Sequence, residues 1–270
     1  MKRAPVANRS AFIATKEHKR FCETADAVRQ DRYIGICFGP AGIGKTLSAR
    51  RYARWDTAEP LLDKWAARTT SDAAICSALA RKRTIFYTPS VGCSLRELRD
   101  DIFRLTVRAH ACIGEHLSGE PVIGTDLPEL VIVDETKRLA ATGLEYVRGL
   151  FDRTSIGVIL IGMPGIEKRL ARYPQLYSRI GFAHQYRPLR GDELTFVLTR
   201  RWRRLGLNLD GADFTDAQAM ASITRVTVSN FRLLNRLFIQ IERILKVNGM
   251  TIVTNDIIEA VRRTLVIGVT

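Results

Sequence analysis

The segment from residue 39 to residue 46, Gly-Pro-Ala-Gly-Ile-Gly-Lys-Thr, limits the possible folds of this chain more than any other stretch. It fits the phosphate-loop pattern G-x-x-x-x-G-K-[ST]. Residues 33–38 before it predict a short buried strand, and residues 47–53 after it have helix-forming composition. Glycines let the backbone curl so that successive N–H groups point at a phosphate, and the helix adds its positive N-terminal end. The sequence therefore predicts a phosphate-binding loop between a strand and a helix.

This loop identifies the residues expected to bind a nucleotide, taken to be ATP with Mg²⁺. Lys45 is expected to contact the β- and γ-phosphates, and the hydroxyl of Thr46 to bind Mg²⁺. A glycine-rich turn without a ligand is the alternative, and the two flanking elements argue against it. The full set of expected nucleotide contacts is Gly39, Pro40, Ala41, Gly42, Ile43, Gly44, Lys45, Thr46 and Leu47.

Strand-like and helix-like segments alternate through the first two thirds of the chain, and the last third is helical in pattern. Further strands are expected at residues 84–88, 130–135, 155–162 and 183–186. Residues 56–83 are interpreted as helical, and later helices are expected at 191–204, 215–222, 229–246 and 254–265. The fold class is therefore α/β, a five-stranded parallel P-loop sheet with helices on both faces, followed by a small all-helical lid domain. The expected division is an N-terminal arm and helix (1–30), a P-loop core (31–188) and the lid (189–270).

Two acidic residues follow the apolar segment 130–133. Because parallel strands present their carboxyl ends to one crevice, Asp134 and Glu135 are expected to face the phosphate loop. Asp134 would hold Mg²⁺ through water, and Glu135 would orient and deprotonate the water that attacks the γ-phosphate. An acidic pair that merely ends a strand is the alternative.

The composition adds a strong charge imbalance. The 270 residues include 42 Lys and Arg against 28 Asp and Glu, a formal net charge of +14. Such an excess favours a polyanionic partner such as nucleic acid over a merely soluble basic surface. The five cysteines show no zinc-ligand spacing, and no apolar run approaches the ~20 residues of a membrane span. We therefore expect a cytoplasmic protein with no membrane partner.

Taken together, these motifs resemble the AAA+ ATPases, and within them the transposition regulators of the TniB/TnsC/MuB type. The resemblance rests on the phosphate loop and on four further stretches. These are Ala-Arg-Arg-Tyr (49–52), Asp-Glu-Thr-Lys-Arg-Leu (134–139), Leu-Ile-Gly-Met-Pro-Gly (160–165) and Pro-Gln-Leu-Tyr-Ser-Arg-Ile-Gly (174–181).

The resemblance implies further catalytic roles. Arg179 falls where these ATPases place the arginine finger that enters a neighbouring subunit's site, with Arg172 as the second candidate. Arg232 matches the sensor-two position, which reaches the γ-phosphate from the lid. Gly162 and Met163 stand where a polar sensor residue usually ends the fourth strand, which implies slow hydrolysis. Phe12, Ile13 and Tyr33 are the candidates for the adenine pocket.

The resemblance also implies ATP-dependent assembly into a hexameric or heptameric ring, or a helical filament, on double-stranded DNA. Such an oligomer would mark a target and recruit a transposase of the DDE integrase type, with or without a target-selection factor, and hydrolysis would disassemble it. It would be associated with the nucleoid. Arg96, Arg99 and Arg104 are the expected DNA contacts, and residues 200–204 form a second basic cluster. A helicase loader and a signalling switch without a DNA role are the alternatives.

Overall fold

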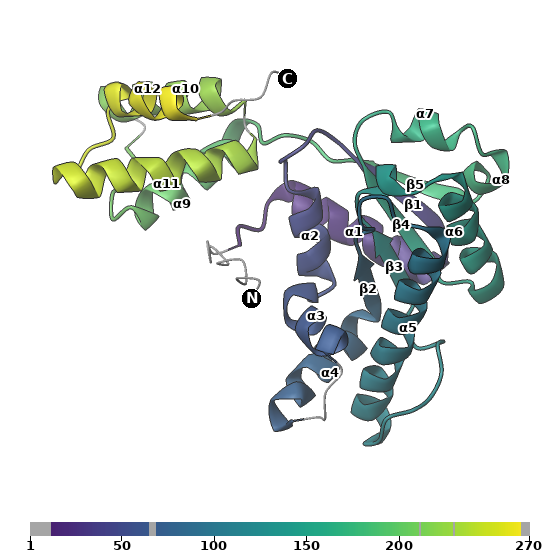
Figure 1. The fold of residues 1–270 in the computed structure, drawn as a ribbon. Helices are drawn as coiled ribbons and strands as arrows, with labels where there is room; N and C mark the ends of the chain where they lie inside the picture. Colours follow the sequence, from purple (N-terminus) through teal and green to yellow (C-terminus); the bar gives the residue numbers. More distant parts are fainter. Residues whose placement is uncertain (1–11, 65–68, 211, 229, 266–270) are drawn as a thin grey trace.

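The sheet at the centre of the molecule contains five parallel strands in the order β2-β3-β4-β1-β5. The structure is a computed structural model that describes residues 12–64, 69–210, 212–228 and 230–265. The strands are β1 (Ile34–Phe38), β2 (Thr84–Tyr87), β3 (Leu130–Val133), β4 (Gly157–Gly162) and β5 (Ile180–Gln185). All six residues of β4 are buried, as expected for the middle of a parallel sheet covered on both faces. The predicted α/β fold is confirmed (Figure 1).

The register of the strands brings their carboxyl ends to one edge of the sheet. Phe38 pairs with Gly162 and Tyr87 pairs with Val133, so the segments that follow β1, β2, β3 and β4 leave from the same edge. In open parallel sheets, ligands bind in the crevice outside this edge. The topology therefore places the segment after β1 and the segment after β3 at a common site.

Helices surround the sheet. They are α1 (Lys16–Asp31), α2 (Lys45–Tyr52), α3 (Trp55–Lys64), α4 (Ala73–Lys82), α5 (Leu95–Ser118), α6 (Ala141–Thr154), α7 (Ile166–Leu170) and α8 (Pro174–Tyr177), with 3-10 turns at Thr70–Asp72 and Thr136–Arg138. Helix α1 packs very closely on the sheet, because a Cβ added to Gly157 would lie 2.6 Å from the carbonyl oxygen of Val28. The glycine is thus required by this close approach.

The boundaries of some elements differ from those predicted. The strand expected over 130–135 ends at Val133, because Glu135 adopts a left-handed conformation with φ 49° and a 3-10 turn follows. The helix that the sequence predicts over residues 137–152 consequently starts at Ala141, as α6. Strand β5 begins at Ile180, three residues earlier than expected, and the helical segment 56–83 is divided into α3, a 3-10 turn and α4. Residues 1–11 of the predicted arm and the start of the predicted 229–246 helix lie outside the described residues.

A second hydrophobic core lies in the C-terminal helices α9 (Gly191–Arg204), α10 (Phe214–Thr227), α11 (Phe231–Asn248) and α12 (Asn255–Thr264). At its centre, Trp202 is 1% exposed and its ring contacts Phe238 edge-on at 5.4 Å, so this tryptophan anchors the lid helix α9. The core of the sheet extends along the chain to Tyr186, and the second core begins at Leu189. The C-terminal helices therefore form the expected lid, which Figure 1 shows beside the sheet.

Helix α1 belongs to the core of the sheet, to which it contributes Phe21, Ala25 and Val28. Ile13, just before it, packs against the core of the lid. The division of the chain at residues 30 and 188 stays a prediction. Among the helices that the structure describes, none combines the length and the hydrophobicity that a bilayer crossing requires.

Candidate nucleotide site

The phosphate loop connects β1 to α2 and depends on its glycines. Gly42 and Gly44 have φ angles of 77° and 114°, which side chains other than glycine rarely adopt. A Cβ at Gly39 would lie 2.4 Å from the carbonyl oxygen of Tyr186. Glycine is thus required at 42 and 44 by the backbone conformation, and at 39 by the close approach of the segment after β5.

Lys45, at the start of α2, folds back into the loop. Its Nζ donates hydrogen bonds to the carbonyl oxygens of Gly39 at 2.6 Å and Pro40 at 2.7 Å, and the residue is only 8% exposed. Burial lowers the pKa of its ammonium group, and Arg232 contributes to the lowering. The ammonium therefore lies inside the curve of the loop, where a bound phosphate would meet it.

Thr46 and Asp134 meet at the carboxyl edge of the sheet. The Thr46 hydroxyl donates to Oδ2 of Asp134 at 2.7 Å, and the backbone N–H of Glu135 donates to Oδ1 of Asp134 at 2.8 Å. Asp134 is 4% exposed, and burial raises the pKa of its carboxyl group. A hydroxyl and a carboxylate are oxygen donors of the kind that Mg²⁺ accepts beside substrate phosphates and waters. These residues therefore fit the expected metal ion.

Glu135 lies beside Asp134 but is more exposed. Its backbone is left-handed, and its Oε2 lies 3.4 Å from Nζ of Lys137. The carboxylate is close enough to Lys45 to oppose the lowering of the lysine's pKa. Glu135 thus shares the site with Lys45, Thr46 and Asp134.

The lid reaches the phosphate loop through the start of α11. Asn230 donates from Nδ2 to the carbonyl oxygen of Ala41 at 2.7 Å, and the backbone N–H of Arg232 donates to the carbonyl oxygen of Gly42 at 3.0 Å. The Oδ1 of Asn230 also accepts from the N–H groups of Arg232 and Leu233, so this residue is the N-cap of α11. The structure therefore brings the backbone of Arg232 to the loop, and the contact of its side chain with the γ-phosphate stays a prediction.

Sequence reasoning missed the roles of two residues that shape this site. Asn230 carries the signal of a helix N-cap, but its contact with Ala41 spans 189 residues of sequence. Tyr186 follows β5, and its hydroxyl lies 2.8 Å from Oγ of Ser48 in α2. Burial raises the pKa of this phenol to about 12, so it stays protonated as a hydrogen-bonding group. Tyr186 thereby ties the segment after β5 to the helix that follows the loop.

Arg179 lies at the amino ends of the strands, whereas the phosphate loop of the same chain lies at their carboxyl ends. It immediately precedes β5, and its carbonyl oxygen accepts from the N–H of Ile34 at the start of β1. A six-residue strand such as β5 spans about 20 Å, which an arginine side chain cannot bridge. Arg179 is therefore not part of the site formed by its own chain.

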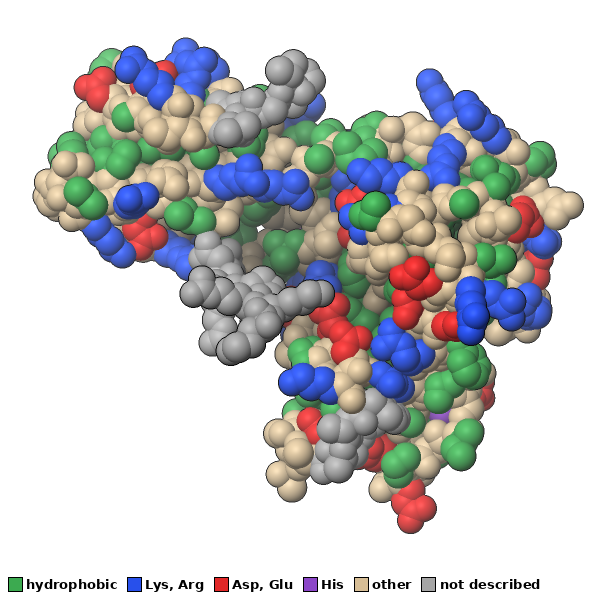
Figure 2. All heavy atoms as spheres, viewed as in Figure 1, with side chains coloured by type: hydrophobic (Ala, Val, Ile, Leu, Met, Phe, Trp, Pro, Cys, Tyr) green, Lys and Arg blue, Asp and Glu red, His purple; other side chains and the backbone are tan. Residues whose placement is uncertain are grey.

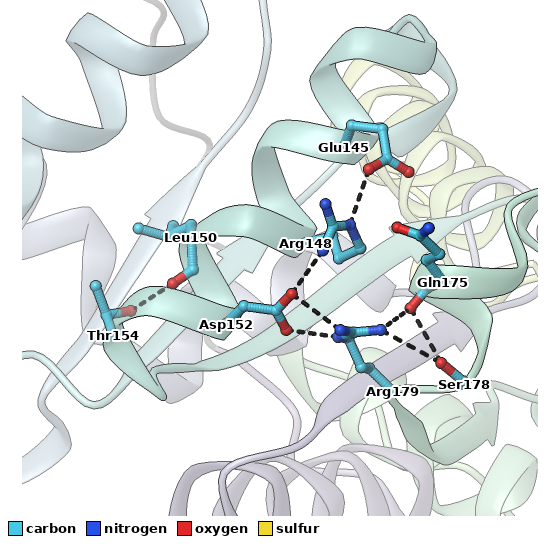
Figure 3. A network of polar contacts seen from close by, with 8 residues as sticks. All are labelled: Glu145, Arg148, Leu150, Asp152, Thr154, Gln175, Ser178 and Arg179. Atoms are coloured by element: carbon cyan, nitrogen blue, oxygen red, sulfur yellow. Dashed lines mark hydrogen bonds and ion pairs between the residues drawn. The ribbon is translucent and has the colours of Figure 1, made fainter.

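A network of charged residues holds Arg179 in place (Figure 3). The guanidinium makes a two-point contact with Asp152 near the end of α6, with Nη2 3.0 Å from Oδ2, and its Nη1 donates to the carbonyl of Gln175. Arg148 donates to both Asp152, at 2.6 Å, and Glu145. The hydrogen bond from Arg179 is the main cause that lowers the pKa of Asp152. Arg172, the second candidate, is exposed after α7.

The remaining candidates are also separated by the fold. Tyr33 precedes β1 at the amino edge and packs on Phe182 at 5.7 Å, which excludes it from an adenine pocket at the carboxyl edge. Phe12 lies 5.4 Å below the guanidinium of Arg51 in α2, on the side of the phosphate-loop helix. Gly162 at the end of β4 packs closely against Ile166, and Met163 follows it. Neither position therefore offers the polar side chain that usually ends the fourth strand in the ATPases that the sequence resembles.

The three arginines predicted to contact DNA lie on α5 but do not share a face. Arg104 donates to Asp101 at 2.7 Å and lies 3.8 Å from Asp63, so two carboxylates neutralise it. Arg96 is 93% exposed, with Asp100 at 3.7 Å, and Arg99 is exposed as well. Positions 99 and 104 are five residues apart, about 140° around a helix. Figure 2 shows Lys and Arg side chains over both the sheet domain and the lid, mixed with acidic and apolar groups.

Fold and site together define a P-loop ATPase-type domain of the AAA+ class with a helical lid, and comparison with known proteins agrees. The model of the AAA domain family matches residues 28–170. A Staphylococcus aureus protein described as "Potential ATP-binding protein" is 41% identical over 96% of this chain and 97% of its own length. The chain belongs to the AAA domain family.

Solved structures show the same fold. Thermotoga maritima RuvB, described as a Holliday junction branch migration motor, superposes with a TM-score of 0.57 at 18% identity, covering 93% of this chain and 69% of RuvB. The ADP form of the Aeropyrum pernix ORC2 protein gives a TM-score of 0.55 at 12% identity, covering 93% of this chain and 68% of its own. At these identities the likeness concerns the fold, and it includes the helical lid.

Proposed function

We propose that this protein binds ATP with Mg²⁺ in the crevice between the phosphate loop and the lid, and hydrolyses it slowly. The observation that carries the proposal is the contact of Thr46 with Asp134 beside the buried Lys45, which gathers a phosphate-binding ammonium and two metal-binding oxygens at one edge of the sheet. The S. aureus relative described as a potential ATP-binding protein supports it.

Each residue has a distinct task in this proposal. The amides of residues 39–47 and the ammonium of Lys45 bind the phosphates, while Mg²⁺, held by Thr46 and Asp134, neutralises charge on them. Glu135 accepts the proton of the attacking water. Arg232 adds a positive charge from the lid. Since Gly162 and Met163 offer no polar side chain to orient the water, turnover is slow.

Completion of the site requires a second subunit. Arg179 lies at the amino edge of the sheet and is tied to Asp152, so it can act as an arginine finger only in a neighbouring chain. We therefore propose a homo-oligomer, a ring of six or seven subunits or a helical filament, in which ATP lies between subunits. The lid is hydrogen-bonded directly to Ala41 and Gly42 of the phosphate loop. Nucleotide bound in the loop can therefore change the position of the lid, and with it the orientation of neighbouring subunits.

We further propose that the oligomer assembles on double-stranded DNA and serves DNA transposition by marking a target for a DDE-type transposase. The resemblance to TniB/TnsC/MuB regulators and the net charge of +14 support this role. On α5, Arg96 and Arg99 are the candidate DNA contacts, and Arg104 would have to leave two carboxylates to join them. Nucleoid association and a target-selection factor belong to the same proposal.

ATP binding is tested first with the purified chain. Wild type should be stabilised against heat by ATP with Mg²⁺, and Lys45→Ala should lose at least tenfold in affinity, because it removes the buried ammonium. Lys64→Ala makes the same change at an exposed position at the end of α3, so it is the matched control and should bind normally. A folded wild-type chain that gains no stability from ATP and Mg²⁺ would reject the proposal.

The DNA role is tested by electron microscopy and sedimentation with a non-hydrolysable ATP analogue, with duplex or single-stranded DNA, over a series of salt concentrations. The proposal predicts nucleotide-dependent oligomers on duplex DNA, with an affinity that falls steeply with salt because counterions are released. Preference for single strands would instead favour a helicase loader. No binding to either DNA would favour a signalling switch.

A further inference from the structure

The lid contains a small recess that the nucleotide site does not use. It lies between α9 and α11, has a volume of about 40 Å³, and is lined by Arg201, Arg204, Leu205, Asn235, Phe238, Ile239 and Glu242. Since a site for one water needs roughly 10–15 Å³ by this kind of measure, the recess has room for a few waters or one small chemical group.

Arg201 is the unusual member of this lining. It is 7% exposed, and its side chain makes no hydrogen bond or ion pair with any residue that the structure describes. Its Nε is buried without a partner, and burial lowers the pKa of the guanidinium, with the charge of Arg204 adding to the effect. A buried charge of this kind is costly unless an opposite charge pairs with it.

Glu242 does not supply that opposite charge. It lines the same recess, but its carboxylate lies 2.7 Å from Nζ of Lys246, one turn further along α11. The groups that face Arg201 from α9 and α11 are therefore a second guanidinium, the amide of Asn235 and a carboxylate already engaged elsewhere. The lid contains a recessed positive charge with an open volume beside it.

We propose that this recess binds one carboxylate from an acidic side chain of a partner protein. A guanidinium can donate two parallel hydrogen bonds to a carboxylate, and the amide of Asn235 is a further donor at the same recess. Leu205, Phe238 and Ile239 provide apolar walls for the methylene groups of the acidic side chain and its apolar neighbours.

The shape of the recess favours an acidic peptide over DNA. Arg201 lies below the surface, so its ligand has to enter between two helices. A flexible aspartate or glutamate side chain can do so, whereas a duplex presents its phosphates on a broad convex surface, suited to protruding Lys and Arg. Glu242 at the recess also disfavours a continuous row of phosphates. The inference concerns the lid alone and does not depend on ATP binding.

The test uses the full chain labelled with ¹⁵N in arginine, so that the Nε–H signal of Arg201, assigned by its loss in Arg201→Met, reports on the recess. The probe is the tripeptide Leu-Glu-Leu with blocked ends, and Leu-Gln-Leu is its matched neutral control. We expect the Glu peptide to shift this signal with a Kd of about 1 mM or tighter, and the Gln peptide to bind at least tenfold more weakly.

Variants provide the second readout. Arg203→Met removes the same charge from an exposed position on α9 and should leave the peptide affinity unchanged. Arg201→Met should abolish binding yet keep or raise the melting temperature, because it replaces an unpaired buried charge with an apolar side chain. A fall in its melting temperature would show that Arg201 is a structural residue and would overturn the proposal.

Other ligands decide the remaining outcomes. If inorganic phosphate shifts the Arg201 signal as strongly as the Glu peptide, the recess is a general anion site and the proposal fails. If a duplex oligonucleotide shifts it while the Glu peptide does not, the recess belongs to a DNA-binding surface. Equal binding of the Glu and Gln peptides, or binding of neither, would also refute the proposal.

Discussion

The tasks that the proposed function assigns to single residues of the site should be separable, because the contacts of these residues differ. Asp134 is buried and bonded to Thr46, which suits a permanent metal-binding oxygen. Glu135 is more exposed and adopts a left-handed backbone at φ 49°, which costs strain for a residue other than glycine. Strain of this kind is typical of functional positions. A substitution at Glu135 should therefore impair ATP hydrolysis without weakening nucleotide binding.

Glu135→Gln should lower the rate of ATP hydrolysis by about 10²–10⁴-fold while keeping the affinity for ATP. The amide keeps the size of the side chain but cannot accept a proton. Turnover by phosphate release and affinity by thermal stabilisation would be measured on the same preparation. Glu120→Gln, the same change at an exposed position in the loop after α5, is the control and should hydrolyse ATP normally. Unchanged turnover in Glu135→Gln would remove this residue from its assigned role.

Arg179 should set the titration of Asp152. The folded-state pKa of Asp152 is lowered, so the contact stabilises the fold above the unfolded value of 3.8 and is lost as pH falls through the lowered folded pKa. Arg179→Met should therefore raise the pKa of Asp152 toward 3.8, as measured from the ¹³C shift of its carboxyl group. Arg172→Met is the control, and an unchanged pKa in Arg179→Met would contradict the pairing.

At the scale of elements, the junction of α11 with the phosphate loop is the feature that links lid and sheet. Asn230 caps α11 through its Oδ1 and contacts Ala41 through its Nδ2, so one side chain serves both the helix and the loop. A Cβ on Gly42 would lie 2.5 Å from Oδ1 of Asn230, which shows how closely the two elements approach. The lid thereby helps to set the shape of the loop that would hold the phosphates.

Asn230→Ala should destabilise the protein by about 0.5–2 kcal/mol through the lost cap. It should also weaken ATP binding, because the Ala41 carbonyl loses its partner. Thr254→Ala removes the cap of α12, where Thr254 accepts from the N–H of Ile257, far in sequence from the loop. This control should lose similar stability in thermal unfolding and keep its ATP affinity. Equal ATP affinities in both variants would show that Asn230 acts only as a cap.

The sequence predicted what is local and missed what is distant. The phosphate loop and its flanking elements are contiguous, so their pattern predicted their structure, and Asp134 followed from the rule that parallel strands end at one edge. The start of β5 was misplaced because it is an edge strand with alternating half-buried and exposed residues, which gives a weak apolar signal. Arg104 pairs with Asp101 on α5 and with Asp63 on α3. Hydrophobic periodicity alone does not reveal such ion pairs.

At the scale of the whole molecule, the proposed function assigns the two parts of one catalytic site to opposite ends of the strands of the sheet. The phosphate loop, Asp134 and Glu135 lie at the carboxyl edge, and Arg179 lies at the amino edge. In a head-to-tail assembly, the amino edge of one subunit can face the carboxyl edge of the next, and such heterologous contacts generate rings or filaments. Activity should accordingly be a property of the assembly.

Mixing two inactive variants tests this directly. Lys45→Ala keeps the arginine but cannot bind ATP well, and Arg179→Ala binds ATP but lacks the finger, which should cost about 10³-fold or more in turnover. In a mixture, an Arg179→Ala site that faces a Lys45→Ala neighbour regains a complete set of groups. The mixture should therefore hydrolyse ATP faster than either variant alone. No recovery at any ratio would place the finger elsewhere, with Arg172 as the next candidate.

The separation of the two hydrophobic cores has a consequence for how the protein melts. The sheet and the lid each bury their own apolar side chains, and the described polar links between them include the bonds of Asn230 and Arg232 to the loop and that of Lys16 to Glu193. Two such cores need not unfold in one cooperative step. A nucleotide bound to both the sheet domain and the lid would couple their unfolding into one transition. Calorimetry should therefore show two unfolding transitions for the free chain and one for the nucleotide-bound chain.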